Sequence, residues 1–271
     1  MARNRHKAVF DYPWCIYCGG QTVATTVDHV PAIMMFDQRI RPKGLEFPSC
    51  AACNNGTRKS ELVASLLSRV FPDATSSKDQ AEVKQLFSSV NNNIPGLLEE
   101  MQVGRARAKF AAQRHGNPAG GFLDWNGPLV SAHLDAFAAK LGFAFHYYAT
   151  GNPIPPGGGV VSAIHSNVDA VLGRIPSDVF DVLGDPQTLA QGAKNVGEQF
   201  RFASVRDENR NMSISFASFR ESFSVTTYGA AVAEMLLVDG VMPAKLFQPG
   251  DLQKPVLGAE FPRISFNWIA R

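Results

Sequence analysis

The clearest pattern of apolar and polar positions lies between residues 57 and 72. After a polar run at residues 57–61, apolar side chains recur three and four residues apart, which is the spacing of one helix face. These apolar residues are Leu62, Val63, Leu66, Leu67 and Val70. Pro72 cannot continue a helix, because it lacks a backbone N–H and its ring clashes with the preceding turn. The pattern therefore predicts an amphipathic helix that ends before Pro72.

Further helices are predicted at residues 81–90, 97–113 and 128–141. The first should break at the asparagines of 91–93, which Pro95 follows. The last should end at Gly142, because glycine readily takes the left-handed conformation of a helix C-cap. The aromatic segment 143–150 is then expected to form a strand.

Alternating apolar and polar residues predict an antiparallel meander late in the chain, at residues 199–205, 212–219 and 222–228. A shorter β-branched run at residues 21–27 predicts one strand near the N-terminus. Residues 32–47 and the Pro/Gly-rich residues 152–159 are expected to be loops. The pattern as a whole indicates an α+β fold.

The polar segment 73–78 is the predicted domain boundary, with one module at residues 1–72 and a mixed domain at residues 73–271. In the second domain, helices are expected at about 78–141 and the meander at about 199–228. The hydrophobic content of 45% is ordinary for a globular protein. No apolar run follows the basic N-terminal residues and none is long enough to span a bilayer, so a soluble, cytoplasmic protein without membrane contact is expected.

All four cysteines of the chain lie in two Cys-x-x-Cys pairs, Cys15 with Cys18 and Cys50 with Cys53. Each short pair can present two sulfurs to one point, and Zn²⁺ prefers four such ligands in a tetrahedron. The spacing therefore predicts a structural zinc site. Two disulfides in a secreted chain are the alternative, which the lack of a signal sequence disfavours.

The net charge of +2 identifies no partner, but its distribution is uneven. Residues 1–72 carry nine Lys and Arg against five Asp and Glu. Basic side chains near the cysteine pairs are candidates for contacts to nucleic-acid phosphates, and ordinary solvated surface is the alternative for each. The candidates are Arg39, Arg41, Lys43, Arg58 and Lys59.

Three sequence features occur together in this module: the pair C-x-Y-C-G, then T-x-D-H-x-P around Asp28 and His29, then C-x-x-C-N ending at Asn54. Together they resemble the zinc-stapled branch of the HNH (ββα-metal) endonuclease family, over residues 15 to about 61. The resemblance implies a zinc-bound ββα-metal module, in which a β-hairpin and a helix hold one catalytic divalent cation beside a DNA phosphate. RNA is not excluded as a substrate.

The resemblance also implies roles for particular residues. His29 is expected to be the general base, since an imidazole can take a proton from water at neutral pH. Asp28 and Asn54 are expected to hold Mg²⁺ or Mn²⁺, with Zn²⁺ purely structural. If one helix continued from Asn54, Glu61 would share its face and could complete the metal shell through a water; the alternative is an ordinary first-turn carboxylate.

The module departs from the family pattern at residues 43–46, where an asparagine that steadies the loop of the catalytic histidine is absent. Asp37 or Gln38 could take its place. The expected function is metal-dependent DNA hydrolysis, with phage defence or restriction as a setting suggested by analogy alone. The alternative is a zinc-ribbon module that binds nucleic acid or protein without catalysis. Residues 73–271 leave room for a regulatory partner or a homo-oligomer contact.

Overall fold

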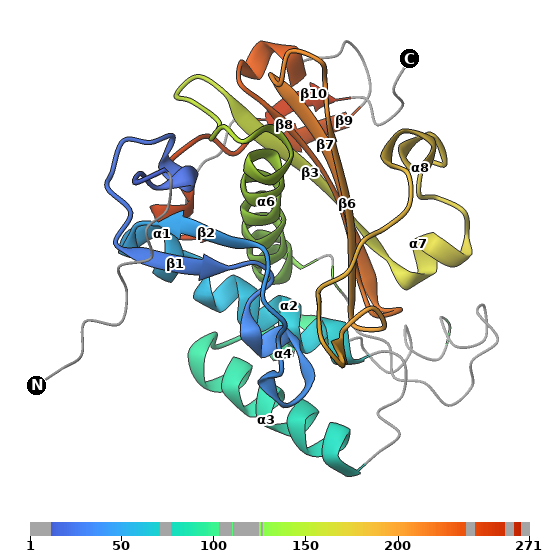
Figure 1. The fold of residues 1–271 in the computed structure, drawn as a ribbon. Helices are drawn as coiled ribbons and strands as arrows, with labels where there is room; N and C mark the ends of the chain where they lie inside the picture. The colour runs from blue at the N-terminus through green and yellow to red at the C-terminus, as the bar shows by residue number, and fades with distance from the viewer. Residues whose placement is uncertain are drawn as a thin grey trace, which may run out of the picture.

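The computed structural model describes residues 12–70, 77–102, 110, 125, 127–236, 242–257 and 263–266. The first part of the chain forms short turns, a two-stranded sheet and two consecutive helices (Figure 1). The elements are η1 (Ile16–Cys18), β1 (Thr26–His29), η2 (Ile33–Met35), η3 (Asp37–Arg39), β2 (Glu46–Ser49), α1 (Ala51–Gly56) and α2 (Arg58–Val70). The amphipathic helix expected before Pro72 is confirmed as α2.

Strands β1 and β2 pair in antiparallel register, with Thr26 opposite Ser49 and His29 opposite Glu46. The strand expected at residues 21–27 thus begins later and includes the Asp-His pair itself. Because successive side chains of a strand point to opposite faces, Asp28 and His29 face in opposite directions. Asp28 is buried, whereas His29 is exposed.

The next helices are α3 (Ser77–Asn93) and α4 (Leu97–Met101). The break expected at residue 91 is wrong, because α3 continues through the asparagines. The amide of Asn93 donates a hydrogen bond of 2.7 Å to the Ser89 carbonyl, so asparagine completes the last helical turn instead of ending it. Of the helix expected at residues 97–113, α4 confirms the start, and most of the remainder lies outside the described residues.

The long helix α6 (Pro128–Thr150) corrects two expectations at once. Gly142 does not end this helix, and residues 143–150 are helical rather than extended. A Cβ atom at residue 142 would lie 2.3 Å from Val160 Cγ1, so glycine is needed there for close packing against a strand. The left-handed C-cap is Gly151, with φ of 76°. Phe143 and Phe145 of this segment are buried against the helix's neighbours, and that burial outweighs their strand propensity.

The main sheet has four antiparallel strands in the order β3-β8-β7-β6. The meander is confirmed as β6 (Phe200–Arg206), β7 (Met212–Phe219) and β8 (Phe223–Ala230), whereas β3 (Gly159–Ser166) was not predicted. The smaller elements are α7 (Asn167–Val171), α8 (Asp178–Leu183), β4 (Ala190–Gln191), β5 (Lys194–Asn195), η4 (Ala233–Leu236), β9 (Met242–Lys245), η5 (Asp251–Gln253) and β10 (Arg263–Phe266). The fold is therefore mixed α+β, as expected.

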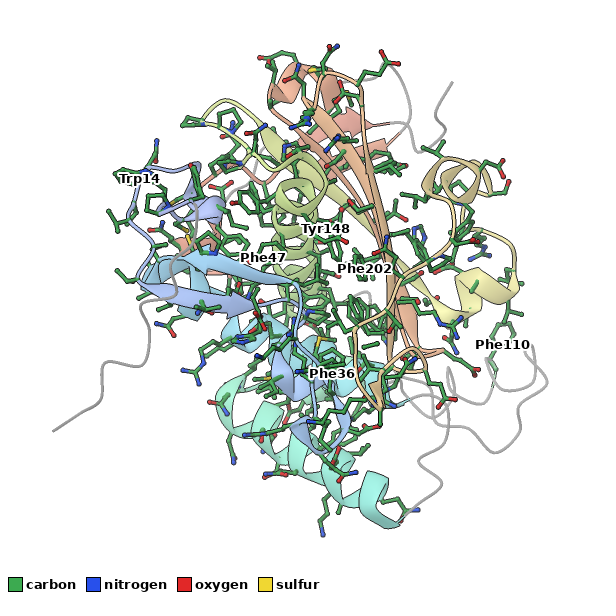
Figure 2. All side chains as sticks on the ribbon, viewed as in Figure 1. Trp14, Phe36, Phe47, Phe110, Tyr148 and Phe202 are labelled. Atoms are coloured by element: carbon green, nitrogen blue, oxygen red, sulfur yellow. The ribbon has the colours of Figure 1, made fainter. Side chains whose placement is uncertain are left out.

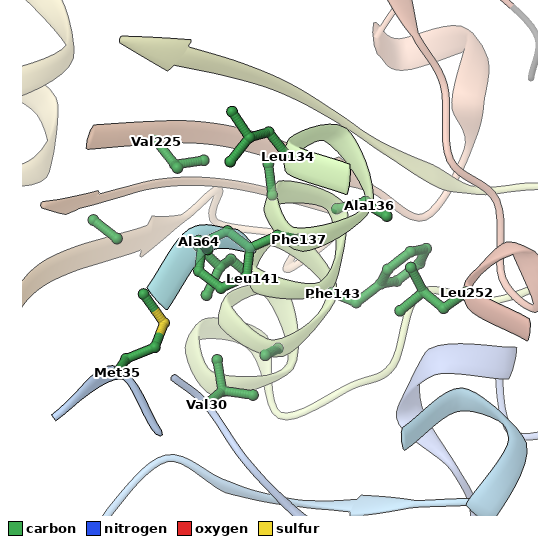
Figure 3. Close-up of a cluster of buried hydrophobic side chains, with 14 of the residues drawn as sticks. Val30, Met35, Ala64, Leu134, Ala136, Phe137, Leu141, Phe143, Val225 and Leu252 are labelled. Carbon is green, nitrogen blue, oxygen red and sulfur yellow. The ribbon is translucent and has the colours of Figure 1, made fainter. Parts of the chain in front are cut away.

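Helix α6 lies between the β1–β2 hairpin and the main sheet (Figure 1). Side chains fill the space on both sides of the helix, from Phe47 on the hairpin to Phe202 on the sheet (Figure 2). Phe137 and Leu141 of α6 lie beside Ala64 of α2 (Figure 3). One continuous apolar core includes residues from both predicted domains. The predicted boundary itself, at residue 72, lies outside the described residues.

None of the helices within the described ranges is both long enough and apolar enough to cross a membrane.

Candidate metal centre and active site

The four cysteines converge on one buried point. Their sulfur atoms all lie within 4.8 Å of one another, although the two pairs come from separate elements. Four thiolates around Zn²⁺ at about 2.3 Å form a tetrahedron whose edges are about 3.8 Å, so a small contraction of this cluster would match it. The residues therefore fit a zinc ion, and with four protein ligands the coordination would be closed to water.

Local backbone geometry explains how each pair reaches this point. The first pair spans η1, which ends at Gly19 in the left-handed conformation, with φ of 63°. The second pair begins α1, where the Cys53 amide donates to the Cys50 sulfur across 3.5 Å. From far along the chain, the Gln253 amide donates to the Cys53 sulfur across 3.4 Å. Such donors outside the ligand set stabilise thiolate charge.

The pKa values of the cysteine thiols differ from one another. The pKa of Cys15 falls to about 5, chiefly because the Cys53 thiol donates a hydrogen bond to it. Burial raises the pKa of Cys18 to about 11, and the Cys15 thiolate raises that of Cys53. A metal cation in this cluster would favour the deprotonated form of all four thiols.

His29 is the accessible member of the Asp-His pair. Its side chain is 49% exposed, and Nε2 lies 4.0 Å from a carboxylate oxygen of Glu46, the residue opposite it in the hairpin. Partial burial and the charge of Arg41 lower the pKa of His29 below its usual value. The imidazole is therefore neutral at neutral pH, which is the form that can accept a proton.

Arg41 holds the loop on which His29 depends. Its guanidinium side chain is only 2% exposed and donates to carbonyl groups on both sides of the long loop between the strands. These carbonyls belong to Val30, Pro31, Pro42, Gly44 and Leu45. Arg41 thus joins the residues that follow His29 to those that precede β2. Its side chain is almost fully buried among these carbonyls, unlike the other four candidate phosphate contacts, which are exposed.

The two residues considered as substitutes for the absent asparagine, Asp37 and Gln38, contact other parts of the chain. The carboxylate of Asp37 accepts a hydrogen bond of 2.5 Å from Arg220 and lies 3.6 Å from Arg69. Gln38 donates its backbone N–H to Glu82 across 2.9 Å. Both contacts fasten the loop to other parts of the chain rather than to His29.

Asp28 and Glu61 meet at a buried lysine of α6. The ammonium nitrogen of Lys140 lies 2.9 Å from each carboxylate oxygen of Asp28 and makes a very short contact to Glu61. Lys140 is only 1% exposed. Burial alone would lower the pKa of Lys140, but the two carboxylates outweigh burial and raise it. The lysine is therefore charged. Burial raises the pKa of Glu61, the carboxyl group at the very short contact.

The remaining expected site residues lie at different places in the module. Asn54 is half-buried and donates to the Thr26 hydroxyl on β1 across 3.2 Å. Thr57 separates α1 from α2, so Asn54 and Glu61 do not lie on one continuous helix. Four of the candidate phosphate contacts are exposed, namely Arg39, Lys43, Arg58 and Lys59.

A divalent cation does not fit at Asp28 while Lys140 occupies that position. Within the described ranges, the four cysteines are the one group of three or more His, Cys, Asp or Glu side chains that is close enough to hold a metal ion. His29, Asp28 and Glu61 form no such group. The expected Mg²⁺ or Mn²⁺ site is thus filled by an ammonium group in this structure.

Sequence reasoning missed Lys140, although the sequence carries a signal for it. Residues 136–145 contain one charged side chain in an otherwise apolar stretch. A lysine in a helix that is apolar on all sides must find an anionic partner, because an unpaired buried charge is very costly. That argument predicts an acidic partner for Lys140, but not which one.

No family model, no curated protein and no solved structure matches this chain.

Proposed function

We propose that the chain is an HNH-type endonuclease in which His29 is the general base. The observation that carries this proposal is the exposed imidazole of His29. Two further features support it: the lowered pKa of His29 and the fixing of its loop by Arg41. Asn54, which follows Cys53 in α1, reaches the same hairpin through Thr26. A fixed, neutral imidazole at the surface is suited to taking a proton from water.

In this arrangement His29 can move a proton, and the exposed basic side chains can bind phosphate. His29 would take the proton of a water that attacks phosphorus opposite the leaving oxygen, a role that contributes a rate factor of roughly 10²–10⁴ in enzymes. The exposed Arg58 and Lys59 would contact the phosphate backbone and position it without reading sequence. The resemblance calls for Mg²⁺ or Mn²⁺ at Asp28 and Asn54, but Asp28 pairs with Lys140, so no step is assigned to that cation.

The test is cleavage of supercoiled plasmid, single-stranded DNA and RNA by zinc-loaded protein, with Mg²⁺, with Mn²⁺ and with neither. We expect nicking by the wild type, a loss of at least 100-fold in His29→Ala, and no change in the surface control Lys194→Ala. Equal activity of wild type and His29→Ala on every substrate would refute the assignment.

The pairing of Asp28 with Lys140 favours a second candidate, a zinc-stapled module that binds nucleic acid or protein without cutting. Fluorescence anisotropy of labelled DNA over a range of salt concentrations distinguishes the two candidates. Salt-dependent binding that weakens in Arg58→Ala and Lys59→Ala, without cleavage under any condition, would select the binding module. A regulatory or oligomeric role for residues 73–271, including one in restriction or phage defence, stays a prediction.

A further inference from the structure

A segment from far along the chain lies against both cysteine pairs. Residues 247–253, called the strap below, include η5, which contacts both α1 and η1. In the strap, the Gly250 amide donates a hydrogen bond of 2.9 Å to the carbonyl of Tyr17, which lies within the first pair. The side-chain amide of Gln253 donates to the Cys53 sulfur across 3.4 Å. One segment thus bonds to the backbone of the first pair and to a sulfur atom of the second.

Two glycines beside the cysteine pairs fit closely against the strap. Gly56 is the last residue of α1, and a Cβ atom there would lie 2.0 Å from the Leu252 carbonyl oxygen. Gly19 follows the first pair, and a Cβ atom there would lie 3.2 Å from Pro249 Cβ. Close packing of this kind leaves no room for a methyl group at Gly56. The strap therefore forms part of the packed wall around the cysteine cluster.

The strap is fixed to the rest of the fold near both of its ends. Phe247 exchanges two backbone hydrogen bonds, of 2.8 and 2.9 Å, with Val160 of strand β3 in the main sheet. Leu252 is only 3% exposed and belongs to the same apolar core as Phe143 of α6 (Figure 3). Because these anchors belong to the main sheet and the core, the sheet and the core set the position of Gln253.

The hydrogen bond to Cys53 matters because of the charge on a zinc site of this kind. Four thiolates carry more negative charge than Zn²⁺ neutralises. An N–H group that donates to one of the sulfurs takes up part of that charge, so this sulfur is less readily protonated. Zinc binds to thiolates and not to thiols, so protonation of a ligand releases it. A donor at Cys53 should therefore slow the release of zinc.

We propose that the strap controls the rate at which the cysteine cluster loses zinc, and that Gln253 is the positioning residue through which the strap acts. The four ligands belong to the N-terminal module, but this donor to them is placed by the main sheet and the core. A disturbance of the strap would then speed zinc release without the loss of any ligand. This control does not depend on nuclease activity.

The experiment measures zinc release from full-length, zinc-loaded protein to an excess of the chromogenic chelator pyridylazo-resorcinol. Gln253→Met keeps the length of the side chain and removes the donor, and Gln253→Glu also adds a negative charge. We expect release about tenfold faster in Gln253→Met than in wild type, and faster again in Gln253→Glu. Gln248→Met is the matched control in the same strap, because Gln248 bonds to Asp251 through its backbone N–H, which the substitution keeps. It should release zinc at the wild-type rate.

Co²⁺ in place of zinc separates a bond to sulfur from a general loosening of the fold. The sulfur-to-cobalt charge-transfer absorption should move to longer wavelength in Gln253→Met, because the sulfur electrons lose a stabilising N–H group, and should not move in Gln248→Met. Gln253 is largely exposed, so native circular dichroism is expected in every variant. The proposal is overturned by equal release rates in wild type and Gln253→Met, by an unmoved cobalt absorption, by loss of native structure in Gln253→Met, or by a wild type that holds no zinc.

Discussion

The N-terminal module contains two buried groups of anionic ligands, and they are neutralised in different ways. The four cysteine sulfurs converge within 4.8 Å and match a zinc ion. Asp28 and Glu61 converge on Lys140, which is 112 and 79 residues away in the sequence. The first group is complete within its own module, whereas the second depends on the helix at the centre of the fold. With a metal bound, the first site would hold the module together, whereas the second joins the module to the rest of the chain.

Loss of the cysteine site should have the largest effect. We expect Cys50→Ser to abolish zinc binding and most native structure, because zinc contributes about 10 kcal/mol or more to the folding of small zinc modules. Circular dichroism and zinc content measure this result. A Cys50→Ser protein that keeps native structure and loses zinc would show that the cage does not hold the fold.

Removal of the lysine should cost less. Lys140→Met without added divalent metal should lower the free energy of unfolding by about 3–5 kcal/mol, because it leaves two buried carboxylates without a cation. Lys245→Met should cost at most about 1 kcal/mol, since its ion pair with Asp135 is partly exposed. Urea unfolding compares the two. Equal losses would remove the distinction between a buried cluster and a surface pair.

Substitutions of Arg41 should disturb the loop that follows His29 and leave the cysteine group and the Lys140 group intact. Arg41→Lys retains the charge but cannot serve five carbonyls, and unsatisfied buried carbonyls cost about 1–3 kcal/mol each. We expect faster hydrogen exchange at the Val30 amide, which bonds to Leu45 across the loop. In Arg41→Met, the pKa of His29 should rise, because the cation that lowers it is gone. Proton NMR titration measures the pKa of His29 in both proteins. An unchanged pKa in Arg41→Met would contradict this role of Arg41.

The effect that should be smallest near neutral pH is a pH dependence of stability caused by two buried histidines of α6. Burial lowers the pKa of both His133 and His146 from the usual 6.5 to about 4. Between these values the unfolded chain binds more protons, so stability should fall as pH falls from 6.5 to 4, by at most about 1.4 kcal/mol per pH unit for each histidine. Urea unfolding across this range measures the slope, which His146→Gln should reduce. A slope that His146→Gln leaves unchanged would contradict the role of this histidine.

The sequence allowed some of these features to be predicted because they depend on short-range spacing. The cysteine pairs, the amphipathic helix α2 and the alternating strands β6 to β8 are all encoded within a few residues. The end of α6 was mispredicted, because Gly142 is required by the proximity of Val160 and not by the end of a helix. Lys140, Arg41 and Gln253 act on partners that only the tertiary fold brings close, so no local pattern could assign those contacts.

The central claim is that the cysteines hold a metal while the carboxylates hold a lysine. Native mass spectrometry of wild-type protein prepared with both Zn²⁺ and Mg²⁺ tests it most directly. The predicted result is one zinc ion per chain, lost in Cys50→Ser, and no retained magnesium. A chain without zinc, or one that also retains magnesium in a manner that Asp28→Asn abolishes, would contradict the claim.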